Sequence, residues 1–296
     1  MSDHSLVMAT NSRAANYGDG CFTTIAVLNG RLQLADYHLK RLQSDCTRLG
    51  IDHRAISYVC DDLLTNEASN TEASQQVISL QALMAMLDSH VDHEQAVLKI
   101  LISRGNGGRG YSPASCSNPE AIITLHPFPQ YYAQWRARGV ALGVSPIQLA
   151  EQPLLAGLKH LNRLEQVLIK QALETTEYDD VLVTTLSGEL IEASAANVFW
   201  LAHDGTWCTP KITHAGVNGV CRQWILDFLY GKDLPVNEAH FKLSDVMAAR
   251  AVFLCNAVMQ IMPVNSLESP QGKASFALEP VFKLATKIDD EAIQRA

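Results

Sequence analysis

The chain has 296 residues, of which 47% are hydrophobic and 18% are charged, and its formal net charge at pH 7 is −8. This length and apolar content suffice for one large domain or two ordinary ones, and they exclude a largely disordered chain. An acidic balance without a basic block argues against nucleic acid as a partner, although local basic residues could still bind a small anion.

The N-terminus and the cysteines favour a cytoplasmic protein. Residues 1–5 are polar and precede no apolar run long enough for a secretory signal. No stretch approaches the roughly 20 apolar residues of a membrane span, so we expect no membrane contact. The seven cysteines are an odd number without a CxxC pair, so we expect neither a disulfide framework nor zinc or another metal.

In the first half of the chain, strand and helix patterns are mixed. Two strong signals are the apolar strand that follows Tyr17-Gly18-Asp19-Gly20 and the hairpin dipeptide Asn29-Gly30. The predicted elements are strands over 21–27, 97–103 and 121–125, and helices beginning near residue 39 and over 58–64 and 80–87.

Two prolines within four residues mark a boundary near residue 128. We therefore predict an N-terminal domain over 1–127, a linker over 128–131 and a C-terminal domain over 132–296. The second half contains predicted strands over 140–144, 180–184, 197–201 and 251–255, and helices over 162–174 and after residue 219. This mixture predicts an α/β or α+β class in two domains.

Lys159 is the first candidate for chemistry, in the run Gly157-Leu158-Lys159-His160. A lysine that forms an imine must spend time neutral, and burial or neighbouring cations lower its pKa. The alternative is an ordinary surface lysine near the start of an amphipathic helix.

Glu192, 33 residues later, is the second candidate. A carboxylate at a strand end can keep a ring nitrogen protonated, which together with a reactive lysine suggests pyridoxal phosphate (PLP) as the cofactor. Glu189 is a nearby competitor, but the turn at Gly188 makes it the more exposed of the two. A solvated carboxylate is the alternative for Glu192.

Two further features could bind phosphate. The glycines at 216 and 219 precede an amphipathic helix, whose first N–H groups, at Val220 and Cys221, could cradle an anion. Arg41 could hold a phosphate through two parallel hydrogen bonds. A simple glycine turn and an exposed helical arginine are the respective alternatives.

The segment 104–111 contains a GxGxxG pattern that we do not interpret as a dinucleotide site. Such a site needs a helix to open there, whereas Tyr111-Ser112-Pro113 disfavours a helix. We interpret it instead as a mobile glycine loop over a substrate pocket, in which Arg109 would meet a carboxylate. A plain surface loop is the alternative.

Four motifs together resemble the fold-type IV PLP enzymes, which comprise branched-chain and D-amino-acid aminotransferases and aminodeoxychorismate lyases. These motifs cover 17–24, 103–111, 157–166 and 215–219, and the lysine motif Lys159-His160-Leu161-Asn162-Arg163 is most similar to that of the lyases. The resemblance implies a small N-terminal α/β domain, a larger C-terminal domain with a barrel-like sheet, and a homodimer.

The resemblance also assigns roles by position. Lys159 would bind PLP covalently and Glu192 would face its pyridine nitrogen. The implied phosphate ligands are Arg41, the N–H groups of Val220 and Cys221, and Asn256, which stands where the family often has Thr or Ser. Phe22 stands where some transaminases have a tyrosine, and the loss of that hydroxyl weakens the interpretation as a D-amino-acid transaminase.

The implied activity is conversion of 4-amino-4-deoxychorismate to 4-aminobenzoate and pyruvate, with Lys159 as the general base. Residues expected to contact the substrate are Arg109 first, then Tyr111 and His160, and lastly Thr24. The alternatives are an aminotransferase of the same fold and a binding protein without catalytic activity.

Overall fold

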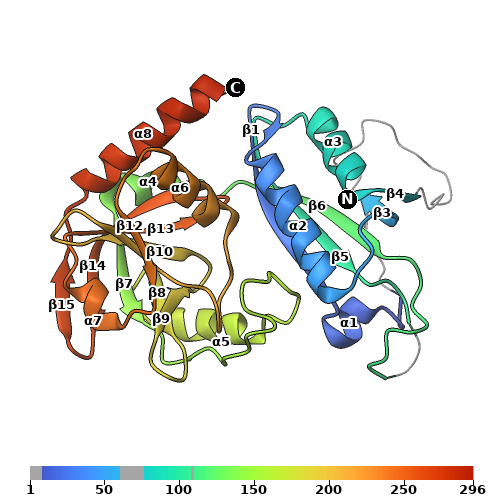
Figure 1. The fold of residues 1–296 in the computed structure, drawn as a ribbon, viewed down its shortest axis with the longest axis horizontal. Helices are drawn as coiled ribbons and strands as arrows, with labels where there is room; N and C mark the ends of the chain where they lie inside the picture. Colours follow the sequence, from blue (N-terminus) through green and yellow to red (C-terminus); the bar gives the residue numbers. More distant parts are fainter. Residues whose placement is uncertain (1–8, 61–76, 108–109, 296) are drawn as a thin grey trace. The chain divides into compact units, whose positions relative to one another are not determined.

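The structure is a computed structural model that describes residues 9–60, 77–107 and 110–295. Its contacts divide the chain into two compact units (Figure 1). Unit 1 is Met1–Phe128 with Lys159–Asn162, and unit 2 is Pro129–Leu158 with Arg163–Ala296. The sequence-based division was contiguous, so it did not include the return of residues 159–162 to unit 1.

Unit 1 contains a six-stranded sheet of order β2-β1-β5-β6-β3-β4, in which the β3–β6 pair is parallel and the other neighbours are antiparallel. Its elements are α1 Arg13–Tyr17, β1 Gly20–Leu28, β2 Arg31–Leu32, α2 Ala35–Leu49, β3 Ile56–Cys60, β4 Val77–Ile78, α3 Leu80–His90, β5 Gln95–Ser103 and β6 Glu120–Pro127. Figure 1 shows α2 lying across this sheet.

Helix α2 packs on β1 because both present one apolar face. On β1, alternate residues such as Cys21 and Ile25 are fully buried, as a strand with one covered face requires. On α2, Leu42 and Cys46 are buried four residues apart, which places them on the same side of the helix. Both expected elements are present, and Asn29 and Gly30 form the turn between β1 and β2 with positive φ angles.

The helix predicted over 58–64 is wrong where the structure describes it. Ile56–Cys60 is strand β3, which pairs in parallel with β6; residues 61–64 lie outside the described residues. The run Ile-Ser-Tyr-Val-Cys is rich in β-branched and aromatic side chains, which suit a pleated surface better than a helix.

Unit 2 is built on a nine-stranded sheet of order β12-β11-β10-β13-β14-β7-β8-β9, with β15 paired to β14. Its elements are α4 Tyr131–Arg138, β7 Val140–Val144, α5 Leu164–Leu173, β8 Asp180–Thr184, β9 Leu190–Ala193, β10 Asn197–Leu201, β11 Trp207–Pro210, α6 Val220–Gly231, β12 Val236–Ala239, α7 Leu243–Met247, β13 Ala251–Asn256, β14 Gln260–Ser269, β15 Gly272–Ser275 and α8 Glu279–Arg295.

The central strands of unit 2 are covered on both faces. Along β10, Val198 and Trp200 belong to one core cluster, whereas Phe199 and Leu201 belong to a second cluster that includes apolar residues of α6 and α8. A strand that is covered on both faces has apolar side chains at successive positions, as residues 198–201 do. This pattern allowed the strand over 197–201 to be predicted from the sequence.

The two ends of this sheet meet, so the sheet closes on itself. Leu190 of β9, at one end of the strand order, bridges to Phe241, which follows β12 at the other end. The N–H of Leu190 donates to the carbonyl oxygen of Phe241 at 2.8 Å. This closure agrees with the barrel-like sheet that the resemblance implied, and we call the Leu190–Phe241 bridge the seam.

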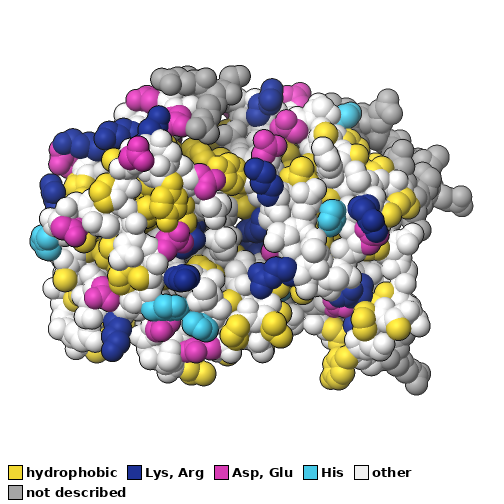
Figure 2. Space-filling view, in the orientation of Figure 1, with side chains coloured by type: hydrophobic (Ala, Val, Ile, Leu, Met, Phe, Trp, Pro, Cys, Tyr) yellow, Lys and Arg dark blue, Asp and Glu magenta, His cyan; other side chains and the backbone are white. Residues whose placement is uncertain are grey.

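The surface carries charges of both signs. Figure 2 shows Lys and Arg side chains interspersed with Asp and Glu side chains on the face drawn. Among residues 9–60, 77–107 and 110–295, no helix is both long and apolar enough to cross a membrane.

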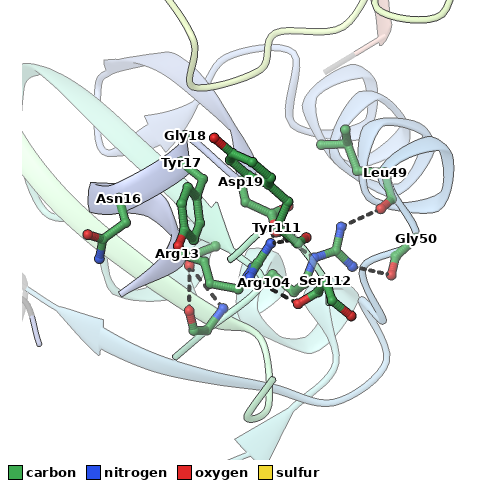
Figure 3. A network of polar contacts seen from close by, with 12 residues as sticks. Arg13, Asn16, Tyr17, Gly18, Asp19, Leu49, Gly50, Arg104, Tyr111 and Ser112 are labelled. Atoms are coloured by element: carbon green, nitrogen blue, oxygen red, sulfur yellow. Dashed lines mark hydrogen bonds and ion pairs between the residues drawn. The ribbon is translucent and has the colours of Figure 1, made fainter. Parts of the chain in front are cut away.

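Asp19 joins two arginines at the start of β1 (Figure 3). The Nε atoms of Arg13 and Arg104 donate to Asp19 Oδ2 at 2.6 and 2.8 Å. Arg104 also donates to the carbonyl oxygens of Leu49 and Gly50 at the end of α2. The two guanidinium groups lower the pKa of Asp19, although its partial burial opposes them. Through Arg104, Asp19 therefore connects the start of β1 to the end of α2.

Arg13 extends this network to the glycine loop. Its guanidinium donates to the carbonyl oxygens of three consecutive loop residues, Gly110, Tyr111 and Ser112, at 3.0–3.3 Å. The loop runs from β5 to β6 without a helix in its described residues, which agrees with our rejection of a dinucleotide site.

We predict that Asp19→Asn lowers the free energy of unfolding of unit 1 by about 3 kcal/mol, because it leaves two shielded guanidinium groups without their counter-charge. Faster hydrogen exchange of the β1 and β5 amides would report this loss. Asp52→Asn, which breaks a solvent-exposed pair with Arg54, is the control and should leave exchange unchanged. Equal exchange in the two variants would contradict a special role for Asp19.

Candidate functional site

Residues 159–161 form an isolated antiparallel β-bridge, between His160 and Cys21, at the open edge of β1. Strand β2 pairs only with the last two residues of β1, so the edge at residues 20–22 is available. There the N–H of Phe22 donates to the carbonyl oxygen of Lys159 at 2.9 Å, and the N–H of Leu161 donates to that of Gly20 at 3.0 Å. The lysine backbone is therefore held by sheet hydrogen bonds and not by a loop.

The Lys159 side chain lies against Phe22. Opposite residues of an antiparallel pair share one face of the sheet, and the Lys159 Nζ lies 4.6 Å from the centroid of the Phe22 ring. The backbone N–H of Lys159 donates to Oδ2 of the buried Asp45 on α2 at 3.2 Å. Lys99 of β5 also places its Nζ over the Phe22 ring, at 5.2 Å.

Arg41 is oriented by a buried polar pair that the sequence analysis did not single out. Its Nη2 donates to Thr23 Oγ1 in a short hydrogen bond, and Thr23 Oγ1 lies 2.6 Å from His38 Nδ1. Arginine can only donate, so Thr23 Oγ1 accepts from Arg41, and the Thr23 hydroxyl can donate to Nδ1 of a neutral imidazole. Nε2 of His38 is buried without a hydrogen-bond partner among the described residues.

The surroundings keep His38 neutral. Complete burial, and then the positive charges of Arg41 and Lys159, lower the pKa of His38 well below its ordinary value. A neutral imidazole can accept the Thr23 proton, which leaves the Thr23 oxygen free to accept from Arg41.

Glu192 is the shielded carboxylate of β9. Glu192 is buried, whereas the side chain of Glu189 is partly exposed, as expected from the turn at Gly188 that directly precedes Glu189. The N–H of Val217 donates to Glu192 Oε2 at 2.9 Å. Gly216 makes this approach possible: a Cβ there would lie 2.4 Å from Ile191 Cγ2, and its φ of 80° disfavours other residues.

The loop that contains Gly216 and Val217 leads directly into the N-terminus of α6. Gly219 caps the helix without a side-chain hydrogen bond, so the N–H groups of Val220 and Cys221 have no partner within the helix. Asn197 fixes the approach to this helix, accepting from the N–H of Gly219 at 3.2 Å and donating to the carbonyl oxygen of Val217 at 2.9 Å.

The chain links Lys159 to the loop that holds Glu192. Within unit 2, the N–H of Gly157 donates to the carbonyl oxygen of Gly216 at 2.9 Å, and the N–H of Asn218 donates to that of Gly157 at 3.1 Å. Lys159 follows Gly157 by two residues in the chain. Within unit 2, Gly157 therefore joins the segment that leads to Lys159 to the loop that binds Glu192.

Asn256 closes the turn between β13 and β14. Its Oδ1 accepts from the N–H groups of Val258 and Met259, and its Nδ2 donates to the carbonyl oxygen of Ala195. The structure therefore gives this side chain a turn-forming role, and its expected contact with phosphate stays a prediction.

The four expected substrate contacts fall in different settings. Thr24 and His160 are half-buried, one on β1 and one in the segment that pairs with it. Tyr111 is 85% exposed, with its ring against Tyr17. Arg109 lies outside the described residues. Their proposed contacts with substrate stay predictions.

Several residues that support the site were missed in the sequence. Thr23, His38, Asp45 and Asn197 are buried polar residues on the apolar faces of their elements. Polar residues at such positions are a signal, because buried polar groups need defined partners. The partners themselves depend on tertiary contacts that periodicity does not report.

Comparison with known proteins shows the family to which the chain belongs. The family described as "Amino-transferase class IV" matches residues 20–267. The chain is 36% identical to "Aminodeoxychorismate lyase" of Vibrio harveyi, over 93% of this chain and 92% of that protein.

Solved structures are similar to this chain over nearly its whole length. The 4-amino-4-deoxychorismate lyase of Pseudomonas aeruginosa is similar with a TM-score of 0.81 and 31% identity, covering 97% of this chain and 96% of that one. The PLP-bound form of a hypothetical aminotransferase from Mycobacterium tuberculosis has a TM-score of 0.74, covering 97% and 95% of the two chains. At 18% identity, the second likeness shows the shared fold alone.

We predict that acid weakens the wild-type chain more than a His38→Gln variant. The folded chain resists protonation of His38 whereas the unfolded chain does not, so stability falls as pH drops below about 6.5, by up to about 1.4 kcal/mol per pH unit. Urea unfolding followed by far-UV circular dichroism between pH 5 and 8 would measure this. Parallel pH profiles for the two proteins would contradict it.

Proposed function

The chain belongs to the class IV aminotransferase family, and we propose that it is a PLP-dependent lyase that converts 4-amino-4-deoxychorismate to 4-aminobenzoate and pyruvate, a step toward folate. One observation carries the proposal most directly. In unit 1, Lys159 is held by β1, and in unit 2, Gly157, two residues earlier in the chain, hydrogen-bonds to the loop that contacts Glu192. The similarity to lyases from two bacteria supports the choice of reaction.

The residues present fit PLP chemically. Glu192 offers a shielded carboxylate for the pyridine nitrogen. The first N–H groups of α6, at Val220 and Cys221, suit a phosphate group, and so does the guanidinium of Arg41. Lys159 offers the amine that would bind the cofactor carbonyl. Asn256 remains a further proposed phosphate contact through its Nδ2 group.

When bound, PLP supplies an electron-accepting ring that stabilises negative charge on the amine-bearing carbon of the substrate. Glu192 would hold a proton on the ring nitrogen and so maintain that capacity. The Lys159 amine would remove the proton from the amine-bearing carbon as general base. The ether C–O bond at the neighbouring carbon then breaks, the departing oxygen takes up a proton, and the carbocycle becomes aromatic as pyruvate is released.

Substrate recognition requires donors for two carboxylates. Arg109 is our first candidate, because a guanidinium can bind a carboxylate through two parallel hydrogen bonds. Tyr111, His160 and Thr24 are further candidates. The anchoring of Gly110–Ser112 by Arg13 supports this proposal, because it fixes the backbone next to Arg109.

An aminotransferase of the same family is the second candidate function. It would use the same lysine but return the amino group to a 2-oxo acid. The ring of Phe22 lies beside the Lys159 amine and carries no hydroxyl, which weakens the D-amino-acid form of this candidate. A lyase releases pyruvate without an amino acceptor, whereas an aminotransferase needs a 2-oxo acid. Pyruvate release in the absence of a 2-oxo acid therefore distinguishes the two candidates.

We predict that Lys159→Ala abolishes covalent PLP binding and lowers 4-aminobenzoate formation by several orders of magnitude, because it removes both the anchoring amine and the proposed base. Absorbance of the cofactor and a 4-aminobenzoate assay would measure the two losses. Lys99→Ala is the matched control, because Lys99 contacts the same Phe22 ring. It should keep covalent PLP.

Two outcomes would overturn parts of this proposal. Covalent PLP retained by Lys159→Ala would remove the lysine from its role. Wild-type protein that consumes alanine and 2-oxoglutarate but forms no 4-aminobenzoate would instead favour the aminotransferase.

We also propose a homodimer, supported by an exposed apolar stripe on α5. Leu164, Val167 and Leu168 are 72, 58 and 42% exposed, and their spacing of three and four residues places them on one face of the helix. Exposed leucines in such a stripe are typical of a surface that contacts another protein.

The proposed location and the other partners follow from composition. An odd number of cysteines without a CxxC pair supports the cytoplasm. The net charge of −8, together with charges of both signs on the surface, supports small molecules and not nucleic acid as ligands. No membrane partner is proposed.

We predict that the double variant Leu164→Glu/Leu168→Glu is monomeric, because charges would replace the apolar stripe at a self-association surface. Sedimentation velocity at micromolar concentration would measure the change. Phe282→Glu, at an exposed apolar residue of α8, is the control and should leave the dimer intact. A double variant that sediments as the wild type does would exclude the stripe from the interface.

A further inference from the structure

Two histidines and a glutamate converge at the seam of the unit 2 sheet, and none of the three is among the residues assigned to catalysis or to the cofactor. Glu189 directly precedes β9, His240 directly follows β12, and His214 lies in the loop before α6. One potential ligand atom from each lies within 4.8 Å of the others. In Figure 2, two neighbouring histidine side chains are visible over the region of β9, beside acidic side chains.

We propose that Glu189, His214 and His240 form a binding site for one divalent transition-metal ion of the zinc class. Two imidazoles and one carboxylate are a ligand set that zinc accepts, with water completing four-coordination. The site contains no cysteine, so the cysteine pattern that argued against zinc gave no information about it.

The geometry needs only small side-chain movements to accept an ion. Ligand atoms of a tetrahedral zinc site are about 3.3 Å apart, given bonds of about 2.0–2.1 Å. His240 Nδ1 and Glu189 Oε2 are already 2.9 Å apart, and the two imidazole centroids are 5.2 Å apart. A shift of one or two ångströms at partly exposed side chains would bring all three within bonding distance.

Backbone hydrogen bonds fix the three segments before any ion binds. The seam bond from Leu190 to Phe241 joins the residues that follow Glu189 and His240. The carbonyl oxygen of His214 accepts from the N–H of Gln152 at 2.7 Å. Binding therefore orders three side chains but no loop, which keeps its entropic cost small.

A second hydrogen bond orients His214. Its Nδ1 lies 3.2 Å from Thr213 Oγ1, so the other ring nitrogen, Nε2, is the one available to a metal. A metal-bound histidine ordinarily donates its other N–H to such an oxygen, which fixes the tautomer and the ring orientation. Glu151 accepts from the N–H of Ser187 at 3.1 Å and adds a second carboxylate to this region.

An ion bound here would cross-link the seam to the loop before α6. His214 is two residues before Gly216, and Val217 of the same loop donates to Glu192. The ion would thus restrain both ends of the closed sheet and the segment that supports Glu192. This inference does not depend on which reaction the chain catalyses.

The test measures Zn²⁺ binding to the tag-free full-length chain after chelator treatment, by equilibrium dialysis and metal analysis. We expect one Zn²⁺ per chain in the wild type and at least about tenfold weaker binding in His214→Ala and in His240→Ala, because each removes a ligand. Thr213→Val should weaken binding by about tenfold without removing a ligand. His203→Ala, at an exposed histidine of unit 2 outside the cluster, is the matched control and should bind as the wild type does.

A second measurement separates binding at the cluster from binding elsewhere. All four tryptophans lie in unit 2, so their fluorescence reports the thermal unfolding of that unit. Zn²⁺ should raise the unfolding temperature of the wild type and of His203→Ala but not of the two ligand variants. Wild-type protein that binds no Zn²⁺, or equal binding by the wild type and both ligand variants, would overturn the proposal.

Discussion

The pairing of residues 159–161 with the open edge of β1 is the constraint on which the proposed site depends. Two sheet hydrogen bonds and the bond from the Lys159 N–H to Asp45 fix the backbone of a residue whose flanking chain belongs to the other unit. Opposite pairing with Phe22 then decides on which face the amine lies. A lysine on an unpaired loop would have to lose this conformational freedom each time that it reacts.

Polar groups inside the two cores extend this positioning. In unit 1, a neutral His38 and Thr23 orient Arg41. In unit 2, Asn197 forms hydrogen bonds with Val217 and Gly219 of the loop that precedes α6. A buried polar group is stable only when its partners are in place, so each contact also selects one conformation of its neighbours.

The sequence predicted those elements whose pattern is local. The strands over 197–201 and 251–255 contain the apolar runs 198–201 and 251–255, and the helix after Gly219 follows from a glycine loop and an amphipathic face. Residues 58–60, which belong to strand β3, were misassigned to a helix because a short apolar run satisfies both periodicities. The return of residues 159–162 to unit 1, and the partners of Asn197 and His38, depend on contacts between distant segments, which no local pattern contains.

The discontinuity of unit 1 has a consequence for its synthesis. Residues 129–158 separate its two parts, so the edge of β1 at residues 20–22 stays unpaired until residue 162 has left the ribosome. An exposed strand edge is a site of non-native pairing, and a nascent chain at this stage carries one next to a nearly complete apolar core. The same segment that presents the lysine therefore also completes the N-terminal sheet, and the emergence of residue 162 from the ribosome marks the point at which that sheet becomes protected.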